Sequence, residues 1–197
     1  VLEEKIQIII DQENHPDKAT LHVRAARRLE ESDDIKSAIK HMACAVELRP
    51  GASRLLRNLG LLFEKAGDEE RMAAYLKKAA STNPQDVITR RILGDFYWKK
   101  KDLLSAVVYY HDVVSMTRKF SQEAVELGEA LLQDKQSRNA KLLFSGIIAK
   151  SPKDQKLIES VIKICFKHDE YVYALKLVKR MIRDFPSNVE LVYQAGN

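Results

Sequence analysis

The sequence contains few cysteines and lacks a long apolar run. Its 197 residues include only two cysteines, one tryptophan and five prolines. Cys44 and Cys165 lie far apart in the chain, so we expect two reduced thiols and not a disulfide. Reduced thiols favour a cytoplasmic location. No run of about 18 apolar residues occurs, which excludes a transmembrane helix of ordinary length within this sequence.

Motifs of enzyme and cofactor chemistry are also missing. The sequence has no glycine-rich phosphate loop, nucleophile elbow or paired-cysteine metal motif, and no two histidines have the i, i+4 spacing of helical zinc sites. Carboxylates cluster at Asp33-Asp34 and at Asp68-Glu69-Glu70. Both clusters fall where helices are expected to begin, so the helix dipole explains them without catalysis. We therefore expect no enzyme activity, cofactor, metal site or small-molecule substrate in this chain.

Neither sign of charge dominates the chain. There are 33 basic and 28 acidic residues, which give a net charge of +5, and the pI is about 9.1. The basic residues are spread along the sequence without forming one basic block. This balance is unlike that of a polyelectrolyte.

The few prolines and glycines reveal an internal repeat. Pro50 and Pro84 are 34 residues apart, and Gly60, Gly94 and Gly128 recur at the same spacing, each after a leucine. The same register holds Pro152 and Pro186, the small residues Ala38, Ala106, Ala140 and Ala174, and the large residues Phe63, Tyr97, Leu131, Met42, Leu76, Tyr110 and Phe144. Agreement among independent columns indicates a repeat array.

These columns resemble the tetratricopeptide repeat (TPR), a helix–turn–helix unit of about 34 residues that ends in proline. The best match is the unit with Leu59-Gly60, Gly67-Asp68 and Pro84. The resemblance implies an all-α fold, a right-handed α-solenoid of helix–turn–helix repeats. It implies five repeats, at 19–52, 53–86, 87–120, 121–154 and 155–188. We expect residues 1–16 to be a helix left from a preceding repeat or domain and residues 189–197 to start a further helix, so the chain reads as a fragment of a longer protein.

Simple packing and hydrogen-bonding rules support this division. Only a small side chain fits where two helices cross closely, so we expect the glycine column to face the alanine column that contains Ala38, Ala106 and Ala140. Asp34, Asp68 and Asp102 recur just before the second helix of a repeat. An aspartate at that place accepts hydrogen bonds from the free N–H groups of the helix.

In the TPR family, the first helix of each repeat lines a concave groove, and the resemblance therefore implies where a partner binds. The groove positions of this sequence hold Arg24, Arg27, Arg54, Arg57, Asn58, Arg91, Asp95 and Trp98. Arginine binds carboxylates with two hydrogen bonds, and arginine and tryptophan are enriched in binding hot spots. The sequence thus predicts a non-catalytic protein–protein interaction scaffold that binds an acidic peptide or helix in its groove.

Other interpretations remain open. The arginines could simply solvate an exposed face and pair with Glu30 or Glu64. Leu2-Glu3-Glu4-Lys5-Ile6 resembles the end of a response-regulator receiver domain, which would make the chain the output half of a phosphorelay protein. The basic pI, Arg90-Arg91 and Lys99-Lys100-Lys101 suggest a nucleic-acid partner. Self-association through uncapped ends, where Leu191, Val192 and Tyr193 lie, is a further alternative.

Overall fold

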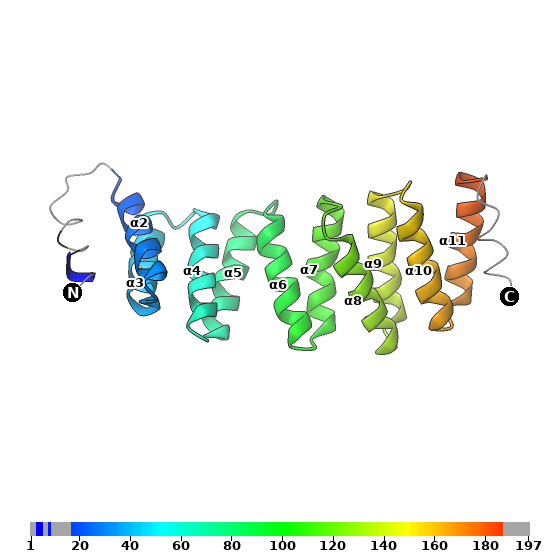
Figure 1. The fold of residues 1–197 in the computed structure, drawn as a ribbon, viewed down its shortest axis with the longest axis horizontal. Coiled ribbons are helices and arrows are strands. Elements are labelled where there is room, and N and C mark those ends of the chain that lie inside the picture. The colour runs from blue at the N-terminus through cyan, green and yellow to red at the C-terminus, as the bar shows by residue number, and fades with distance from the viewer. Residues whose placement is uncertain (1–2, 6–7, 9–16, 187–197) are drawn as a thin grey trace. The chain divides into compact units, whose positions relative to one another are not determined.

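The computed structural model describes residues 3–5, 8 and 17–186 of the chain (Figure 1). Over these residues it contains ten helices and no strand. The helices are α2 (Lys18–Glu31), α3 (Ile35–Leu48), α4 (Ser53–Lys65), α5 (Glu69–Thr82), α6 (Val87–Lys99), α7 (Leu103–Met116), α8 (Ser121–Gln133), α9 (Ser137–Lys150), α10 (Gln155–Lys167) and α11 (Tyr171–Asp184). The expected helix at 189–197, with Leu191, lies outside the described residues, and so does most of the segment 1–16.

The helices follow one another in pairs, and each helix has 13 or 14 residues. The chain divides into two compact units, residues 1–89 and residues 90–197, and the boundary falls inside α6. We call them unit 1 and unit 2. In unit 1, α2 packs on α3, α3 on α4 and α4 on α5, while in unit 2 α7 packs on α9, α8 on α9 and α10 on α11.

One residue in the turn inside each helix pair has a left-handed backbone. The residues are Asp33, Gly67, Lys101, Lys135 and Asp169, with φ of 64°, 75°, 60°, 58° and 61°. At Lys135, the N–H of that residue donates to Leu132 O at 3.0 Å, and the next N–H, of Gln136, donates to Leu131 O at 2.8 Å. This is a Schellman motif, which closes the first helix and reverses the chain. The other four turns have the same hydrogen bonds.

Aspartates cap the helices that follow these turns. The side chains of Asp34, Asp68 and Asp102 accept hydrogen bonds from the N–H groups of Ser37, Arg71 and Ser105, which confirms the capping predicted for this column. Asp17, Asp86 and Asp154 cap first helices in the same way. Each cap satisfies a backbone donor that the helix itself leaves free, which is worth about 1 kcal/mol.

The helices of a pair approach closely at the predicted glycines, and the nearest atoms there belong to large side chains of the second helix. A Cβ built on Gly60 would lie 3.0 Å from Leu76 Cγ, one on Gly94 would lie 2.7 Å from Tyr110 Cδ2, and one on Gly128 would lie 2.2 Å from Phe144 Cε1. At Gly60, Met72 O, from the same column as Ala38, also lies 3.3 Å from the built Cβ, and the pairing with Ala38, Ala106 and Ala140 themselves stays a prediction. The glycines make room for the large side chain that the second helix places at the crossing.

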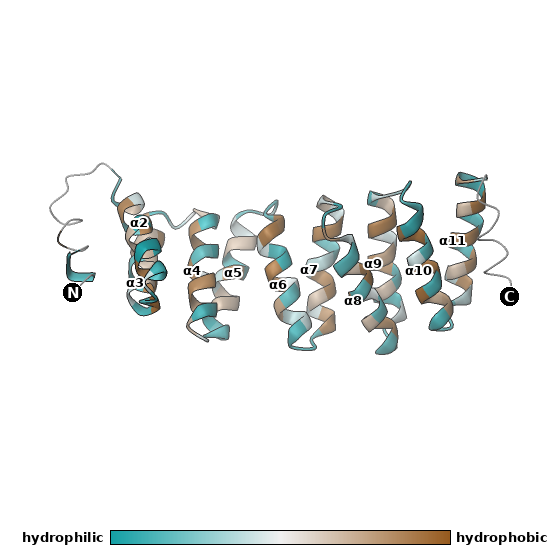
Figure 2. Ribbon diagram, in the orientation of Figure 1, coloured by the Kyte–Doolittle hydropathy of each residue, from teal (hydrophilic) through white to brown (hydrophobic). Residues whose placement is uncertain are grey.

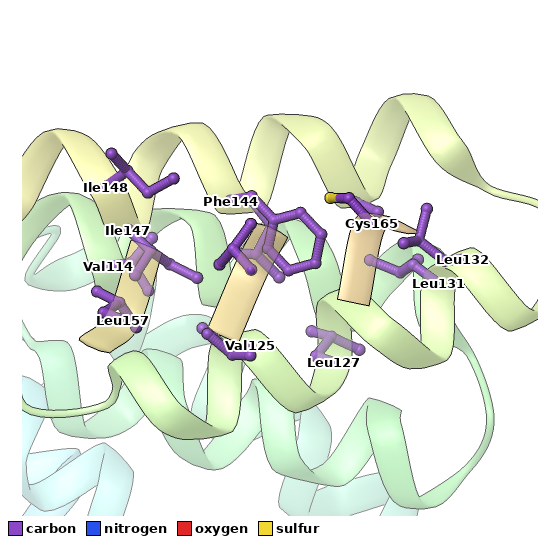
Figure 3. Packing of buried hydrophobic residues seen from close by; sticks show 14 of the residues in the cluster. Val114, Val125, Leu127, Leu131, Leu132, Phe144, Ile147, Ile148, Leu157 and Cys165 are labelled. Atoms are coloured by element: carbon purple, nitrogen blue, oxygen red, sulfur yellow. The ribbon is translucent and has the colours of Figure 1, made fainter. Parts of the chain in front are cut away.

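The core of unit 2 is a continuous cluster of aliphatic side chains around Phe144 and Tyr110. Figure 3 shows Phe144 of α9 with Val125, Leu127 and Leu131 of α8 in this cluster. Cys165 is buried in it, and burial raises the pKa of its thiol to about 11. Hydrophilic residues occupy the other side of the helices, so each helix is amphipathic (Figure 2).

Two histidines join α2 to α3 inside unit 1. The Nδ1 atoms of His22 and His41 lie 3.0 Å apart, so one ring donates a hydrogen bond to the other. His41 is only 3% exposed. Burial lowers the pKa of His41 from its usual 6.5, and His22 and Lys40 lower it further, while Glu3 opposes them. A second proton would leave two donors facing each other.

Replacing Lys135, one of the residues with a left-handed backbone, by glycine should stabilise the protein. Lys135 has a φ of 58° and its side chain is exposed, so Lys135→Gly relieves backbone strain without removing a contact. We expect a gain of about 1 kcal/mol in the free energy of unfolding, measured by urea denaturation. Ala149→Gly, at an exposed position inside α9, is the matched control and should lose about 1 kcal/mol. A loss in both variants would contradict the strain at Lys135.

Gly128→Ala should destabilise unit 2 by about 1–3 kcal/mol, because the new Cβ would overlap Phe144. Gly51→Ala is the control, since nothing lies within 4 Å of a Cβ at that position. Adding Phe144→Leu to Gly128→Ala should recover part of the loss in a double-mutant cycle. A leucine leaves more room at this place, because a Cβ on Gly60 would lie 3.0 Å from Leu76, compared with 2.2 Å between a Cβ on Gly128 and Phe144. Equal losses at Gly128 and Gly51 would show that the crossing does not require glycine.

The histidine pair should make stability depend on pH. Because the pKa of His41 is lowered in the folded state, the unfolded chain binds more protons as the pH falls below 6.5. Stability is therefore highest above that pH and decreases as the pH falls toward the folded pKa. His41→Phe removes this titration, so its melting temperature should vary less between about pH 7 and pH 5 than that of the wild type. Parallel profiles for the two proteins would contradict the assignment.

Candidate partner-binding surface

Three of the predicted binding arginines lie exposed on the first helices of unit 1. Arg24 and Arg27 are three residues apart on α2 and share one face of it, and Arg54 lies in the first turn of α4. Within the described part of the chain none of the three makes a hydrogen bond or an ion pair. Their guanidinium groups are therefore free to bind an anion.

Arg57 also lies on α4 but already binds a carboxylate. Its Nη1 donates to Asp86 Oδ2 at 2.6 Å, and the two side chains are 18% and 9% exposed. Burial opposes the ionisation of Asp86, but hydrogen bonds from Thr89 and the charge of Arg57 outweigh it, so the pKa of Asp86 is lowered. Arg57 thus ties α4 to the cap of α6. Its neighbour Asn58 is half-buried.

The alternative pairing of these arginines with Glu30 or Glu64 is not seen among the described residues. Glu30 Oε1 instead accepts a hydrogen bond from Lys65 Nζ at 2.6 Å. This ion pair is exposed, and it holds the end of α4 against α2 without using an arginine. Among the described residues, no carboxylate of unit 1 therefore neutralises Arg24 or Arg27.

In unit 2 the structure brings the remaining three predicted residues together. Arg91 Nη1 donates to Asp95 Oδ2 at 2.5 Å, and its guanidinium lies 5.2 Å from the centre of the Phe120 ring. The hydroxyl of Tyr110 donates to the other oxygen of Asp95, and the Trp98 ring meets Tyr110 edge-on at 6.1 Å. Burial raises the pKa of Tyr110, so the phenol remains a neutral donor.

Sequence reasoning missed Tyr110 and Phe120 as members of this group. Tyr110 belongs to the large-residue column, which we assigned to packing alone, and its hydroxyl on that column was the available signal. Phe120 lies directly before α8, outside any motif. Tyr110 contacts Asp95 and Phe120 contacts Arg91, so both residues help to position the pair.

A hollow of about 530 Å³ adjoins Trp98 between the end of α6, the start of α7 and the end of α8. Trp98, Leu103 and Ala130 give it apolar walls, and Lys99, Lys101, Gln133 and Asp134 complete its lining. Such a hollow can receive an apolar side chain of a partner, with polar groups around it.

The basic residues that suggested nucleic acid are mostly engaged within unit 2. Arg90 Nε donates to Asp112 Oδ2 at 3.0 Å, and Arg91 binds Asp95. Lys100 Nζ lies 5.9 Å from the centre of the Phe96 ring. The lysines stand at the turn between α6 and α7.

Two further findings concern metal sites and membranes. The described residues contain no group of three or more histidines, cysteines or carboxylates arranged to hold a metal ion. In the same part of the chain, every helix is too short or too polar to cross a membrane.

Comparisons with known proteins agree with the helical-hairpin architecture. Residues 53–86 match the family model of the tetratricopeptide repeat. A search of curated proteins found no significant match. YrrB, described as a TPR protein with an unusual peptide-binding site, has a solved structure that covers 99% of this chain and 100% of its own, at 14% identity and a TM-score of 0.58.

Two other solved structures are similar to the chain. A tetratricopeptide repeat protein from Parabacteroides merdae is 14% identical, with a TM-score of 0.60 over 92% of this chain and 71% of its own. MamA from Desulfovibrio magneticus is 17% identical, with a TM-score of 0.57 over 87% of this chain and 98% of its own. Residues 53–86 thus match a tetratricopeptide repeat, and the chain as a whole has the fold of tetratricopeptide-repeat proteins, which confirms the all-α repeat class predicted from the sequence.

Proposed function

We propose that this chain is a non-catalytic scaffold that binds an acidic segment of a partner protein along the first helices of its repeats. The TPR fold supports a protein–protein interaction role in general. The observation that carries the finer proposal is the set of exposed arginines Arg24, Arg27 and Arg54, which have no partner within the described chain. A scaffold that needed these residues only for its own stability would pair them internally.

Arginine suits this role better than any other cation. Its planar group donates parallel hydrogen bonds to one carboxylate, and it is less strongly hydrated than lysine, so binding costs less desolvation. Arg24 and Arg27 are one helical turn apart, which matches the spacing of carboxylates on a partner helix. YrrB, whose fold this chain shares, is described as having a peptide-binding site, and that description lends support to a peptide as the partner.

The other predicted residues would contribute to binding in different ways. Arg57 and Arg91 already hold Asp86 and Asp95, so a partner carboxylate reaches them only by sharing or displacing those groups. Trp98 and its hollow would take an apolar anchor of the same or another partner segment. Asn58 is placed to donate or accept a single hydrogen bond.

We test the proposal with a fluorescein-labelled oligoglutamate peptide and the full chain. Arg24→Glu with Arg54→Glu replaces attraction by repulsion on α2 and α4 and should weaken binding about tenfold or more, measured by fluorescence anisotropy. The melting temperature should change little, because neither side chain has a partner among the residues that the structure describes.

Lys36→Glu with Lys78→Glu is the matched control, since these exposed lysines lie on the second helices α3 and α5 of the same unit and the change in net charge is identical. This control should retain most of the affinity. Equal losses of affinity in both double variants would show that net charge alone causes the effect. Undiminished binding by the arginine variant would show that the site does not lie on α2 and α4.

A further inference from the structure

A second basic hollow lies in unit 2, between the second helices α9 and α11. Its volume is about 520 Å³. It is lined by Ser145 and Ile148 of α9 and by Tyr173, Lys176, Leu177, Lys179, Arg180 and Arg183 of α11. This hollow shares no residue with the partner-binding surface described above.

The cations of α11 share one face of the helix. Lys176, Lys179, Arg180 and Arg183 follow one another at spacings of three, one and three residues, which places them along a single stripe. The hollow's lining contains no carboxylate. Asp184, beyond the lining, accepts from Arg180 Nε at 3.3 Å and from Arg183 Nε at 2.8 Å. Lys176 and Lys179 are exposed and make no such bond within the described chain.

The rest of the lining suits the backbone of a peptide and the methylene groups of its side chains. Ile148 and Leu177 are buried apolar residues at the base of the hollow. The Ser145 and Tyr173 hydroxyls lie 3.0 Å apart and bond to each other. Burial raises the pKa of Tyr173, so its phenol remains protonated and can donate a hydrogen bond at physiological pH.

From this arrangement we infer that the hollow between α9 and α11 binds an acidic peptide segment lengthwise along α11. Carboxylates of the segment pair with Lys176 and Lys179, and the methylene groups of its side chains pack on Ile148 and Leu177. Arg183, which is bonded to Asp184, adds positive charge at the other end of the hollow. The cations extend over about 10 Å of helix, which is longer than one phosphate or carboxylate needs and matches several residues of a peptide. The chain would thus hold acidic segments on two separate surfaces.

The hollow favours a peptide over a nucleic acid. Single strands bind by stacking bases on exposed aromatic faces, and the hollow's lining offers only the half-buried ring of Tyr173, whose hydroxyl is bonded to Ser145. Its base is aliphatic, which suits the methylene groups of glutamate. Nucleic acid is nevertheless a distinct outcome of the test below.

Calorimetric titration of the full chain with oligoglutamate tests the inference. Lys176→Glu with Lys179→Glu should lower the stoichiometry by one peptide per chain, or weaken one class of site about tenfold, while circular dichroism melting is unchanged. Lys176→Gln with Lys179→Gln should have a smaller effect in the same direction. Lys135→Glu with Lys153→Glu, at exposed turn positions of unit 2, is the control of equal charge and should leave this class of site intact.

The outcome also separates this surface from the one on α2 and α4. Loss caused by the α11 variant and not by Arg24→Glu with Arg54→Glu supports the hollow even where the proposed function fails. Unchanged stoichiometry and affinity in the α11 variant overturn the inference. Equal losses in the control at Lys135 and Lys153 overturn it too. The wild type could also bind an oligouridylate or inorganic phosphate. If the α11 variant lost that binding but kept its binding of oligoglutamate, the hollow would be a phosphate site, and the inference would be overturned.

Discussion

The left-handed residue inside each helix pair is the constraint on which the structure depends. With φ near 60°, it lets two consecutive N–H groups bond back to the first helix, so the chain reverses within a few residues. The following residue then starts the second helix, and in three pairs that residue is an aspartate that caps it. The reversal sets the crossing of the helices, which in turn requires glycine opposite Leu76, Tyr110 or Phe144.

Once the crossing is fixed, each helix has one face in the core and an outer face that can bind other molecules. The charged residues on those outer faces divide into two kinds. Arg57 and Arg91 are held by Asp86 and Asp95 and stabilise their own unit, whereas Arg24 and Arg54 of unit 1 and Lys176 of unit 2 make no such bond within the described chain. This difference in pairing, more than the number of basic residues, separates structural charges from candidate binding charges.

The sequence was sufficient to predict the repeat and much of its local structure. The 34-residue register correctly predicted an all-α repeat, the capping by Asp34, Asp68 and Asp102, and the closing prolines, since α3, α5, α9 and α11 each end two residues before one. The partner of Arg57 was not predictable, because Asp86 lies 29 residues away and only the fold brings it close. The left-handed column was hidden because aspartate and lysine occupy it in four of five turns. The hollow beside α11 depends on side chains from two repeats and so has no local signature.

The closure of each helix pair by its own turn also has a kinetic consequence. The Schellman bonds join residues five positions apart or fewer, and glycine meets its large partner 16 positions away, so most of the order in a pair arises from contacts near in sequence. Chains of such low contact order fold rapidly, and any pair can act as the nucleus on which its neighbours assemble. Amide hydrogen exchange should consequently reveal stepwise opening of neighbouring pairs before global unfolding.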